Sequence, residues 1–209
     1  MILDRGHYGY FFYYWLYSLI LDFRLAGKLL NDTVFNQSER AFPVQSISYP
    51  YIKAFIDCVD FRCDEVFVDV GCAWGRLLGY LRSHTPIKKF IGVELNESVA
   101  ECAAHIFRDD PDVTIISGDI TEKLPLDGTV FYLFNPFDKD TLEKFIEKIE
   151  YNIDHSIRLF YLHPVFREVI DARGPQWKLL DEHKIKPSRL GALTLCIYNF
   201  SPQQKYDIR

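Results

Sequence analysis

The sequence predicts an α/β protein with a doubly wound, mostly parallel seven-stranded sheet, an antiparallel C-terminal hairpin strand and an aromatic-rich N-terminal helical extension. Segments such as 90–93 and 130–134 are continuous apolar runs, which fit strands covered on both faces. Helical segments alternate with these strands, as crossovers between parallel strands require. The last two strand-like stretches flank a loop with Pro187 and Gly191, which is typical of a hairpin at the sheet edge.

Composition limits the classes of function. The chain has 209 residues, of which 48% are hydrophobic and 25% charged, so we expect one globular domain with a terminal extension. Its net charge is -5 and its lysines and arginines form no cluster, so no nucleic-acid partner is expected. The excess of acidic residues would instead suit a cationic ligand. The five cysteines form no C-x-x-C pair, which indicates reduced thiols in a cytoplasmic protein without a metal site.

The first 50 residues are expected to form the helical extension and a lid. From Gly6 to Leu21 there is no Asp, Glu, Lys or Arg, and aromatic residues crowd the run. It has too many tyrosines for a membrane span and lacks the features of a signal peptide. We expect it to pack on its own domain; a homodimer interface and contact with a membrane surface are the alternatives. Residues 27–50, broken by Pro43 and Pro50, are expected to form a long connection or lid.

The main domain is expected over residues 51–209, beginning with a short helix at 51–58. Longer helices are expected at 75–84, 97–108 and 139–150. The strands are expected at 65–70, 89–94, 113–117, 129–134, 157–163, 177–185 and 192–200.

The most informative segment joins the first strand to the first helix of the main domain. Its turn has small residues at Gly71, Ala73 and Gly75, which let the backbone come close to a ligand. The helix that opens at Arg76 presents unpaired N–H groups and a partial positive charge, which suit a carboxylate or phosphate. A strand, a small-residue turn and a helix in this order predict a nucleotide-type binding corner.

The next three strands also end in polar residues. Glu94 could accept hydrogen bonds from ribose hydroxyls, although it could also be a surface carboxylate. Asp119 could accept an adenine amino hydrogen while Ile120 packs on the ring; the alternative is a turn aspartate. The fourth strand runs into 135–137, Asn-Pro-Phe, at the sheet edge where such folds bind ligands, although this could be only a strand-ending turn.

The order of these features, from Asp69 to Gly75 and then through Glu94, Asp119 and Asn-Pro-Phe, resembles the class I S-adenosylmethionine-dependent methyltransferases. The likeness covers roughly residues 52–200 and extends to the closing hairpin. It is greatest to small, substrate-unassigned bacterial and archaeal members with a similar Asn-Pro-Phe. One departure is Ala73, where the family has its central glycine. The resemblance implies S-adenosyl-L-methionine as cofactor, bound by Asp69, Gly71, Cys72, Ala73, Gly75, Glu94, Leu95, Asp119, Ile120 and Asn135.

The resemblance also implies methyl transfer to a small or medium-sized acceptor at nitrogen or oxygen, with catalytic roles for Asn135, Pro136, Phe137 and His163. In relatives with Asn-Pro-Pro-aromatic, the Asn oxygen and a Pro carbonyl accept hydrogen bonds from an amine. This chain has one proline only. Phe137 could stack over the acceptor, and His163 is either a general base or a strand-end residue.

Three residues near the turn have open interpretations. Arg76 could pair with the cofactor carboxylate or form a surface ion pair. Tyr49 and Tyr51, which precede the first strand, could cap the pocket.

Two other functions share much of this pattern. A non-catalytic S-adenosylmethionine-binding protein would keep the fold without the chemistry. An NAD(P)-dependent oxidoreductase would share the strand, turn, helix and acidic residue. However, its G-x-G-x-x-G is absent here, because the glycines at 71, 75 and 79 are spaced by four.

Overall fold

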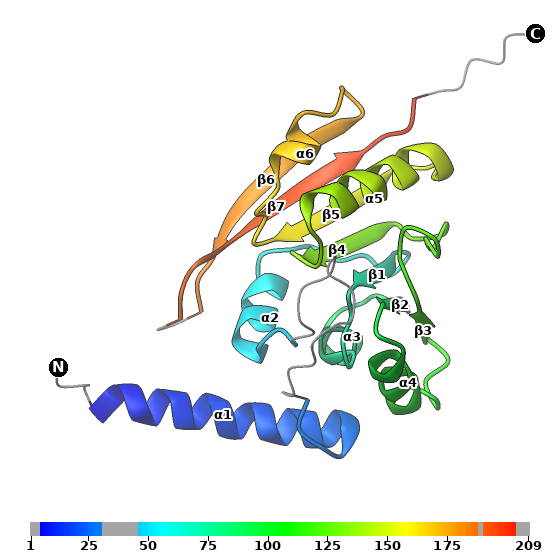
Figure 1. Ribbon diagram of the computed structural model, residues 1–209. Coiled ribbons are helices and arrows are strands. Elements are labelled where there is room, and N and C mark those ends of the chain that lie inside the picture. Colours follow the sequence, from blue (N-terminus) through cyan, green and yellow to red (C-terminus); the bar gives the residue numbers. More distant parts are fainter. Residues whose placement is uncertain (1–4, 31–45, 188–189, 204–209) are drawn as a thin grey trace, which may run out of the picture.

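The computed structural model describes residues 5–30, 46–187 and 190–203, with side chains from Trp15 onward. It contains a seven-stranded sheet in the order β3-β2-β1-β4-β5-β7-β6 (Figure 1). The first five strands are parallel, and β7 inserts antiparallel between β5 and β6, as predicted. The strands are β1 (Val66–Val70), β2 (Lys89–Glu94), β3 (Val113–Ser117), β4 (Val130–Phe134), β5 (Ile157–Leu162), β6 (Trp177–Ile185) and β7 (Leu193–Phe200).

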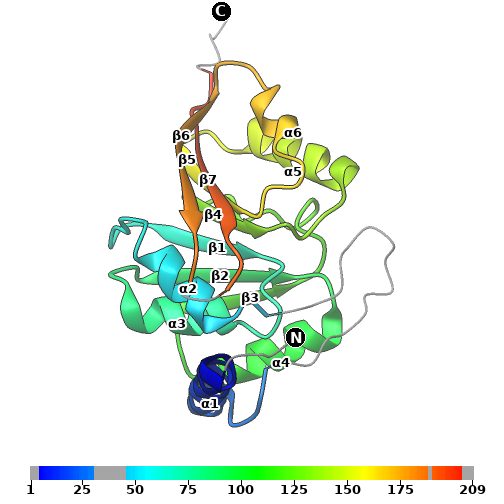
Figure 2. The same ribbon diagram turned by 90° about the vertical axis from the view of Figure 1, so that its left-hand side faces the viewer.

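Helices cover both faces of the sheet (Figure 2). One face carries α2 (Tyr49–Ile56), α3 (Arg76–His84) and α4 (Glu97–Ile106); the other carries α5 (Lys139–Asn152) and the short α6 (Glu168–Asp171), which the sequence analysis missed. Alternate strand residues enter opposite cores: Phe67 packs under α2 and α3, whereas Val68 packs under α5. The strands are apolar at successive positions because both faces are buried, which confirms the doubly wound arrangement.

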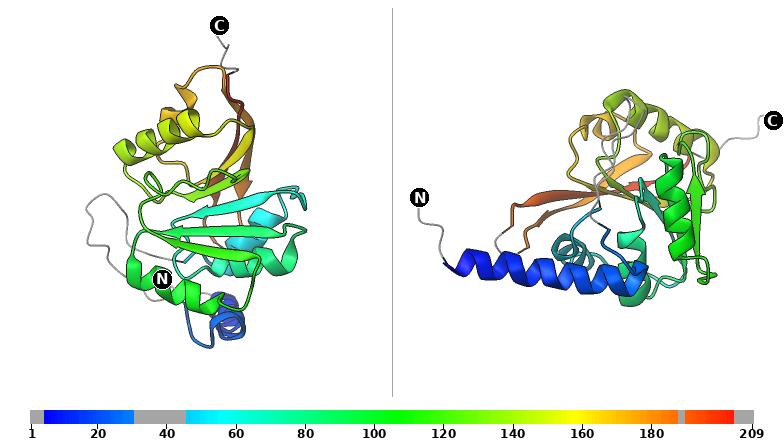
Figure 3. Two further views of the ribbon diagram at one scale, coloured as in Figure 1. Left: turned by 90° about the vertical axis from the view of Figure 1, so that its right-hand side faces the viewer. Right: turned by 60° about the horizontal axis from the view of Figure 1, so that its bottom comes forward.

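Helix α1 (Arg5–Ala26) runs along the outside of the molecule, against α3 (Figure 3). Its contact depends on Gly79, because a Cβ there would lie 2.5 Å from Cδ1 of Leu25. Tyr17 packs edge-on against Tyr49, with ring centroids 6.1 Å apart. Among the described side chains, therefore, one face of α1 packs on its own domain.

The outward face of α1 is apolar and exposed. Trp15, Leu16, Ile20 and Phe23 are each 39–53% exposed. The expectation that the aromatic run is buried thus holds for Tyr17 and fails for Trp15, while residues 8–14 lie outside the described side chains. In the described ranges no helix is long and apolar enough to cross a membrane. Contact of this face with a second copy or a membrane surface stays a prediction.

A buried ion pair fixes α1 to α3. Both side chains are almost fully buried, and the Arg76 guanidinium donates to both carboxylate oxygens of Asp22, at 3.0 and 2.6 Å. Tyr49 donates its hydroxyl to the same carboxylate at 2.8 Å, and its ring lies beneath the guanidinium. Arg76 also donates to the carbonyl oxygens of Leu30 and Ile47. The cluster therefore joins α1, the segments next to residues 31–45, and the start of α3.

Breaking this pair should cost stability, because it leaves a buried guanidinium without its counter-charge. Asp22→Asn should lower the free energy of unfolding by about 3–5 kcal/mol, measured by urea denaturation at pH 7. The matched control is Asp57→Asn, which breaks an exposed pair with Lys53 and should cost under about 1 kcal/mol. Similar small losses in both variants would show that the pair does not anchor the helix.

Candidate functional site

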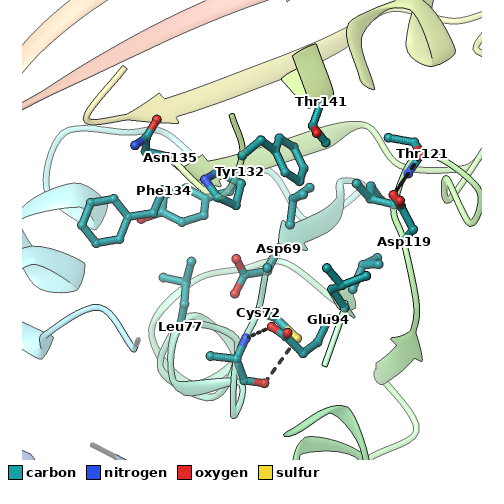
Figure 4. Close-up of a pocket in the computed structure, with 18 of the residues that line it drawn as sticks. Asp69, Cys72, Leu77, Glu94, Asp119, Thr121, Tyr132, Phe134, Asn135 and Thr141 are labelled. Carbon is teal, nitrogen blue, oxygen red and sulfur yellow. Dashed lines mark hydrogen bonds between the residues drawn. The ribbon is translucent and has the colours of Figure 1, made fainter. Parts of the chain in front are cut away.

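A cavity of about 570 Å³ lies at the carboxyl ends of the parallel strands (Figure 4). Ser46 and Ile47 contribute to its wall, next to the part of the chain that is not described. Of the site residues expected from the sequence, Gly75 alone does not line it. Those that do are Asp69, Gly71, Cys72, Ala73, Glu94, Leu95, Asp119, Ile120, Asn135, Pro136, Phe137 and His163.

The small-residue turn uses its own N–H groups. Gly71 and Cys72 donate theirs to the Val93 carbonyl oxygen, at 2.8 and 3.1 Å, and Gly75 donates to the Cys72 carbonyl oxygen at 2.8 Å. A side chain at Gly71 would crowd Pro136, because its Cβ would lie 3.2 Å from that ring. The turn therefore lets a ligand come close to the backbone, but its own N–H groups are already used. A ligand anion would instead bind the N–H groups of the first turn of α3, which have no partner within the helix.

Two buried carboxylates border the cavity. Glu94 is held by two backbone N–H groups, those of Ala73 and Asn96, each at 2.9 Å. Asp69, only 4% exposed, accepts no hydrogen bond from the described residues. Burial, with a smaller effect of the Glu94 charge, raises the pKa of Asp69 to about 8, and burial also raises the pKa of Glu94. No cation of the described residues opposes either shift, so Asp69 is protonated in the free site at neutral pH and a cationic ligand would favour its ionisation.

The Cys72 thiol is also buried at this wall. Burial, together with the Asp69 and Glu94 charges, raises its pKa well above the ordinary value. The thiol is thus a neutral filler at physiological pH and not a nucleophile.

The sequence left open whether Asp119 is a ligand-binding carboxylate or a turn aspartate, and its position in the structure is compatible with both. Its Oδ1 accepts from the N–H and the hydroxyl of Thr121, both at 2.8 Å, as in a turn aspartate. The residue nevertheless lines the cavity, beside the buried Ile120, and its second oxygen makes no hydrogen bond within the described residues. The turn therefore orients a carboxylate that can still accept a ligand hydrogen.

Backbone strain gathers around the cavity. Within the described ranges, the non-glycine residues with positive φ are Ala73 (49°), Asn135 (45°) and His163 (53°). All three line the cavity, directly after β1, β4 and β5. Left-handed backbone costs a non-glycine residue of order 1 kcal/mol or more and tends to persist where function fixes the geometry.

The end of β4 forms the opposite flank of the cavity. Asn135 accepts a hydrogen bond on Oδ1 from the hydroxyl of Tyr161, at 3.1 Å. The Phe137 ring packs against Phe145 of α5, with centroids 5.7 Å apart. His163 is exposed at the mouth. The structure thus brings these candidates to one place, while their catalytic roles stay predictions.

Tyr132 is a lining residue that the sequence analysis did not single out. It lies beside Asp69 in the β1–β4 register, and its hydroxyl is buried without a hydrogen-bond partner among the described residues. In the sequence it sits inside an apolar run, where a tyrosine looks like a packing residue. Only the pairing of β4 with the polar Asp69 of β1 would have indicated a polar role.

Three expectations need correction. Arg76 makes a buried ion pair with Asp22 and not a surface one, whereas its contact with a cofactor carboxylate stays a prediction because it also lines the cavity. Tyr49 does not cap the cavity, since it is bonded to the same carboxylate. Tyr51 instead donates its hydroxyl to the Gly191 carbonyl oxygen, away from the cavity.

Comparison with known proteins matches the fold only. A scan of protein-family models and a search of curated proteins both gave no match. Among solved structures, the mitomycin 7-O-methyltransferase MmcR superposes with a TM-score of 0.60 at 14% identity, over 72% of this chain and 53% of that one. The chain therefore spans about half the length of MmcR.

Two further solved structures are matched over a larger share of their own length. The B. subtilis M1A22 tRNA methyltransferase TrmK has a TM-score of 0.60 at 13% identity, over 75% of this chain and 68% of that one. An RNA methyltransferase from Salinibacter ruber, solved with S-adenosyl-L-homocysteine, has a TM-score of 0.58 at 14% identity, over 78% of this chain and 99% of that one. At these identities the likeness shows the class I S-adenosylmethionine-dependent methyltransferase fold and leaves the acceptor unidentified.

The raised pKa of Asp69 predicts how stability depends on pH. The folded chain holds this proton to about pH 8, whereas an unfolded chain releases it near pH 4, so ionisation favours unfolding across that window. Asp69→Asn should therefore gain stability relative to wild type as pH rises from 5 to 8, by at most about 1.4 kcal/mol per pH unit.

The measurement is urea denaturation at three pH values. The control is Asp154→Asn, whose carboxylate is fully exposed and whose curve should run parallel to wild type. A parallel curve for Asp69→Asn as well would contradict the raised pKa.

Proposed function

We propose that this chain binds S-adenosyl-L-methionine in the cavity and transfers its methyl group to a nitrogen or oxygen of a small or medium-sized acceptor. The observation that carries the proposal is the pair of buried carboxylates, Asp69 and Glu94, whose pKa values are raised by burial with no cation of the described residues opposing the shift. Burying uncompensated acids costs stability unless a ligand supplies the missing charge. A ligand with an ammonium and a sulfonium group meets that requirement.

Arg76 strengthens this argument. It borders the cavity, but its guanidinium is committed to Asp22, at 2.6 Å. Arg76 is accordingly not among the groups that act on the pKa of Asp69 or Glu94. A pocket that is acidic in this way selects for cations by electrostatic attraction in a poorly solvated site.

The contacts proposed for the ribose, the adenine and the carboxylate of the cofactor use protein atoms that can still form hydrogen bonds. The Glu94 oxygens each accept one backbone N–H and can accept a second hydrogen from ribose hydroxyls. The free oxygen of Asp119 suits an adenine amino group, with Ile120 against the ring. The first turn of α3 would take the ligand carboxylate.

Bound in this way, the cofactor would supply an electrophilic methyl group. The protein's task is then to hold an acceptor in line with it, and such alignment can contribute several kcal/mol to the rate. Asn135 and Pro136 flank the position that an acceptor would take, and His163 at the mouth is placed to take a proton. The strained backbone of Asn135 and His163 fixes both side chains relative to the sheet.

The alternatives fit less well. A dinucleotide carries an anionic pyrophosphate, which Asp69 and Glu94 would repel, and the turn has used the N–H groups that a pyrophosphate needs. A non-catalytic S-adenosylmethionine-binding protein would share the acidic cavity but would not need strained residues on the acceptor flank. Catalysis is therefore the better-supported function.

Calorimetric titration tests the cofactor. S-adenosyl-L-methionine and S-adenosyl-L-homocysteine should bind at pH 8, and NAD should not. Asp69→Asn should weaken both ligands by about 1–3 kcal/mol, the usual cost of losing a charged hydrogen-bond partner, although the same variant should stabilise the free protein. Asp154→Asn should change neither property. Unchanged affinity in Asp69→Asn would remove this carboxylate from the site, and preferential binding of NAD would overturn the proposed function.

A further inference from the structure

The acceptor flank of the cavity presents hydrogen-bond donors. Figure 4 shows Tyr132, Phe134 and Asn135 together on one side of the pocket, with Asp69 between them and Glu94. All of these residues line the cavity. Their chemistry indicates which kind of atom this flank would receive.

The orientation of the Asn135 amide follows from its neighbours. Tyr161 is 1% exposed, and its hydroxyl oxygen accepts from the Phe166 N–H at 3.4 Å. The buried hydroxyl proton is used only if Tyr161 donates to Asn135 Oδ1, at 3.1 Å. The amide oxygen is therefore engaged, and the Nδ2 group, with no partner in the described structure, is left to donate into the cavity.

Tyr132 supplies the second donor. The residue is 2% exposed, and its hydroxyl has no hydrogen-bond partner within the described residues. Burial raises the pKa of this phenol well above its usual value, with a smaller contribution from the Asp69 charge, so the proton stays on the oxygen. An unpaired buried hydroxyl destabilises the folded chain until a ligand atom accepts from it.

The surrounding walls favour a flat group. Phe134, Pro136 and the Tyr132 ring line this flank. Aromatic and proline surfaces of this kind stack on planar, apolar rings. A planar acceptor would place an atom on its edge within reach of both donors.

We infer that the methyl acceptor is a planar compound with a hydroxyl group, such as a phenol or enol, whose oxygen accepts from Asn135 Nδ2 and the Tyr132 hydroxyl; this inference rests on the proposed function. An oxygen lone pair of the acceptor forms the new bond to the methyl carbon as the carbon–sulfur bond breaks and its electrons pass to sulfur. The hydroxyl proton passes to solvent, so the sulfonium becomes a neutral thioether and the hydroxyl group a neutral methyl ether.

A matched pair of probes tests this inference. 4-Nitrophenol and 4-nitroaniline, both uncharged at about pH 5, have the same ring but differ in the atom presented. Each is titrated into full-length protein saturated with S-adenosyl-L-homocysteine and followed by ligand-observed proton NMR. The nitrophenol should bind at least about tenfold more tightly than the nitroaniline.

Three variants assign the preference to the two donors. Asn135→Asp replaces Nδ2 with an oxygen and tolerates the same backbone, so it should abolish or reverse the preference. Tyr132→Phe should weaken nitrophenol several-fold without changing nitroaniline. Tyr51→Phe, which removes a tyrosine hydroxyl outside the cavity, should change neither.

Calorimetric titration of every variant with S-adenosyl-L-homocysteine separates failure of the proposed function from failure of the acceptor inference. Absence of binding to wild type would refute the proposed function itself. Intact cofactor binding with equal affinity for both probes, preference for nitroaniline, or no binding of nitrophenol would overturn the acceptor inference alone. A Tyr132→Phe loss that falls equally on S-adenosyl-L-homocysteine would place this hydroxyl on the cofactor and also count against the inference.

Discussion

The buried ion pair between Asp22 and Arg76 is the constraint on which the site depends. Arg76 stands in the first turn of α3, directly after the turn that approaches the ligand, and Asp22 comes from a helix 54 residues away in sequence. The pair also engages the backbone of Leu30 and Ile47, so it positions the chain on both sides of residues 31–45. An N-terminal helix that looks like an appendage is thus anchored to the first turn of α3, next to the site.

The same pair shapes the electrostatics of the cavity. Asp22 engages the Arg76 guanidinium, and no cation of the described residues opposes the raised pKa values of Asp69 and Glu94. The pocket is therefore built at the expense of the free protein, which must hold two buried acids and three left-handed residues in one place. Such a site is complementary to a cationic ligand because that ligand relieves the electrostatic part of the cost. Under the proposed function, stability and ligand binding would oppose each other at Asp69.

Much of the fold could be predicted because it follows from local patterns. The parallel strands are buried on both faces, so runs such as 130–134 are apolar throughout, and small residues mark the turn after β1. The Asp22–Arg76 pair could not be predicted from spacing, since neither residue carries a local signal of its partner. Asp22 did offer one hint, because it is the first acid after the long uncharged run. The orientation of Asn135 depends on Tyr161 and the Phe166 N–H, contacts that exist only once β4 and β5 pair.

The left-handed residues at the ends of β1, β4 and β5 have a consequence for protein engineering. A redesign that sought only thermostability would replace Ala73, Asn135 and His163 with glycine, because glycine adopts this backbone without a steric penalty. Each replacement would ease the backbone at the rim of the cavity, and two of them would delete a side chain that faces an incoming molecule. The positions most attractive for improving the scaffold therefore line the cavity, and a thermostable version that keeps the proposed function would have to find its gains on the opposite edge of the sheet.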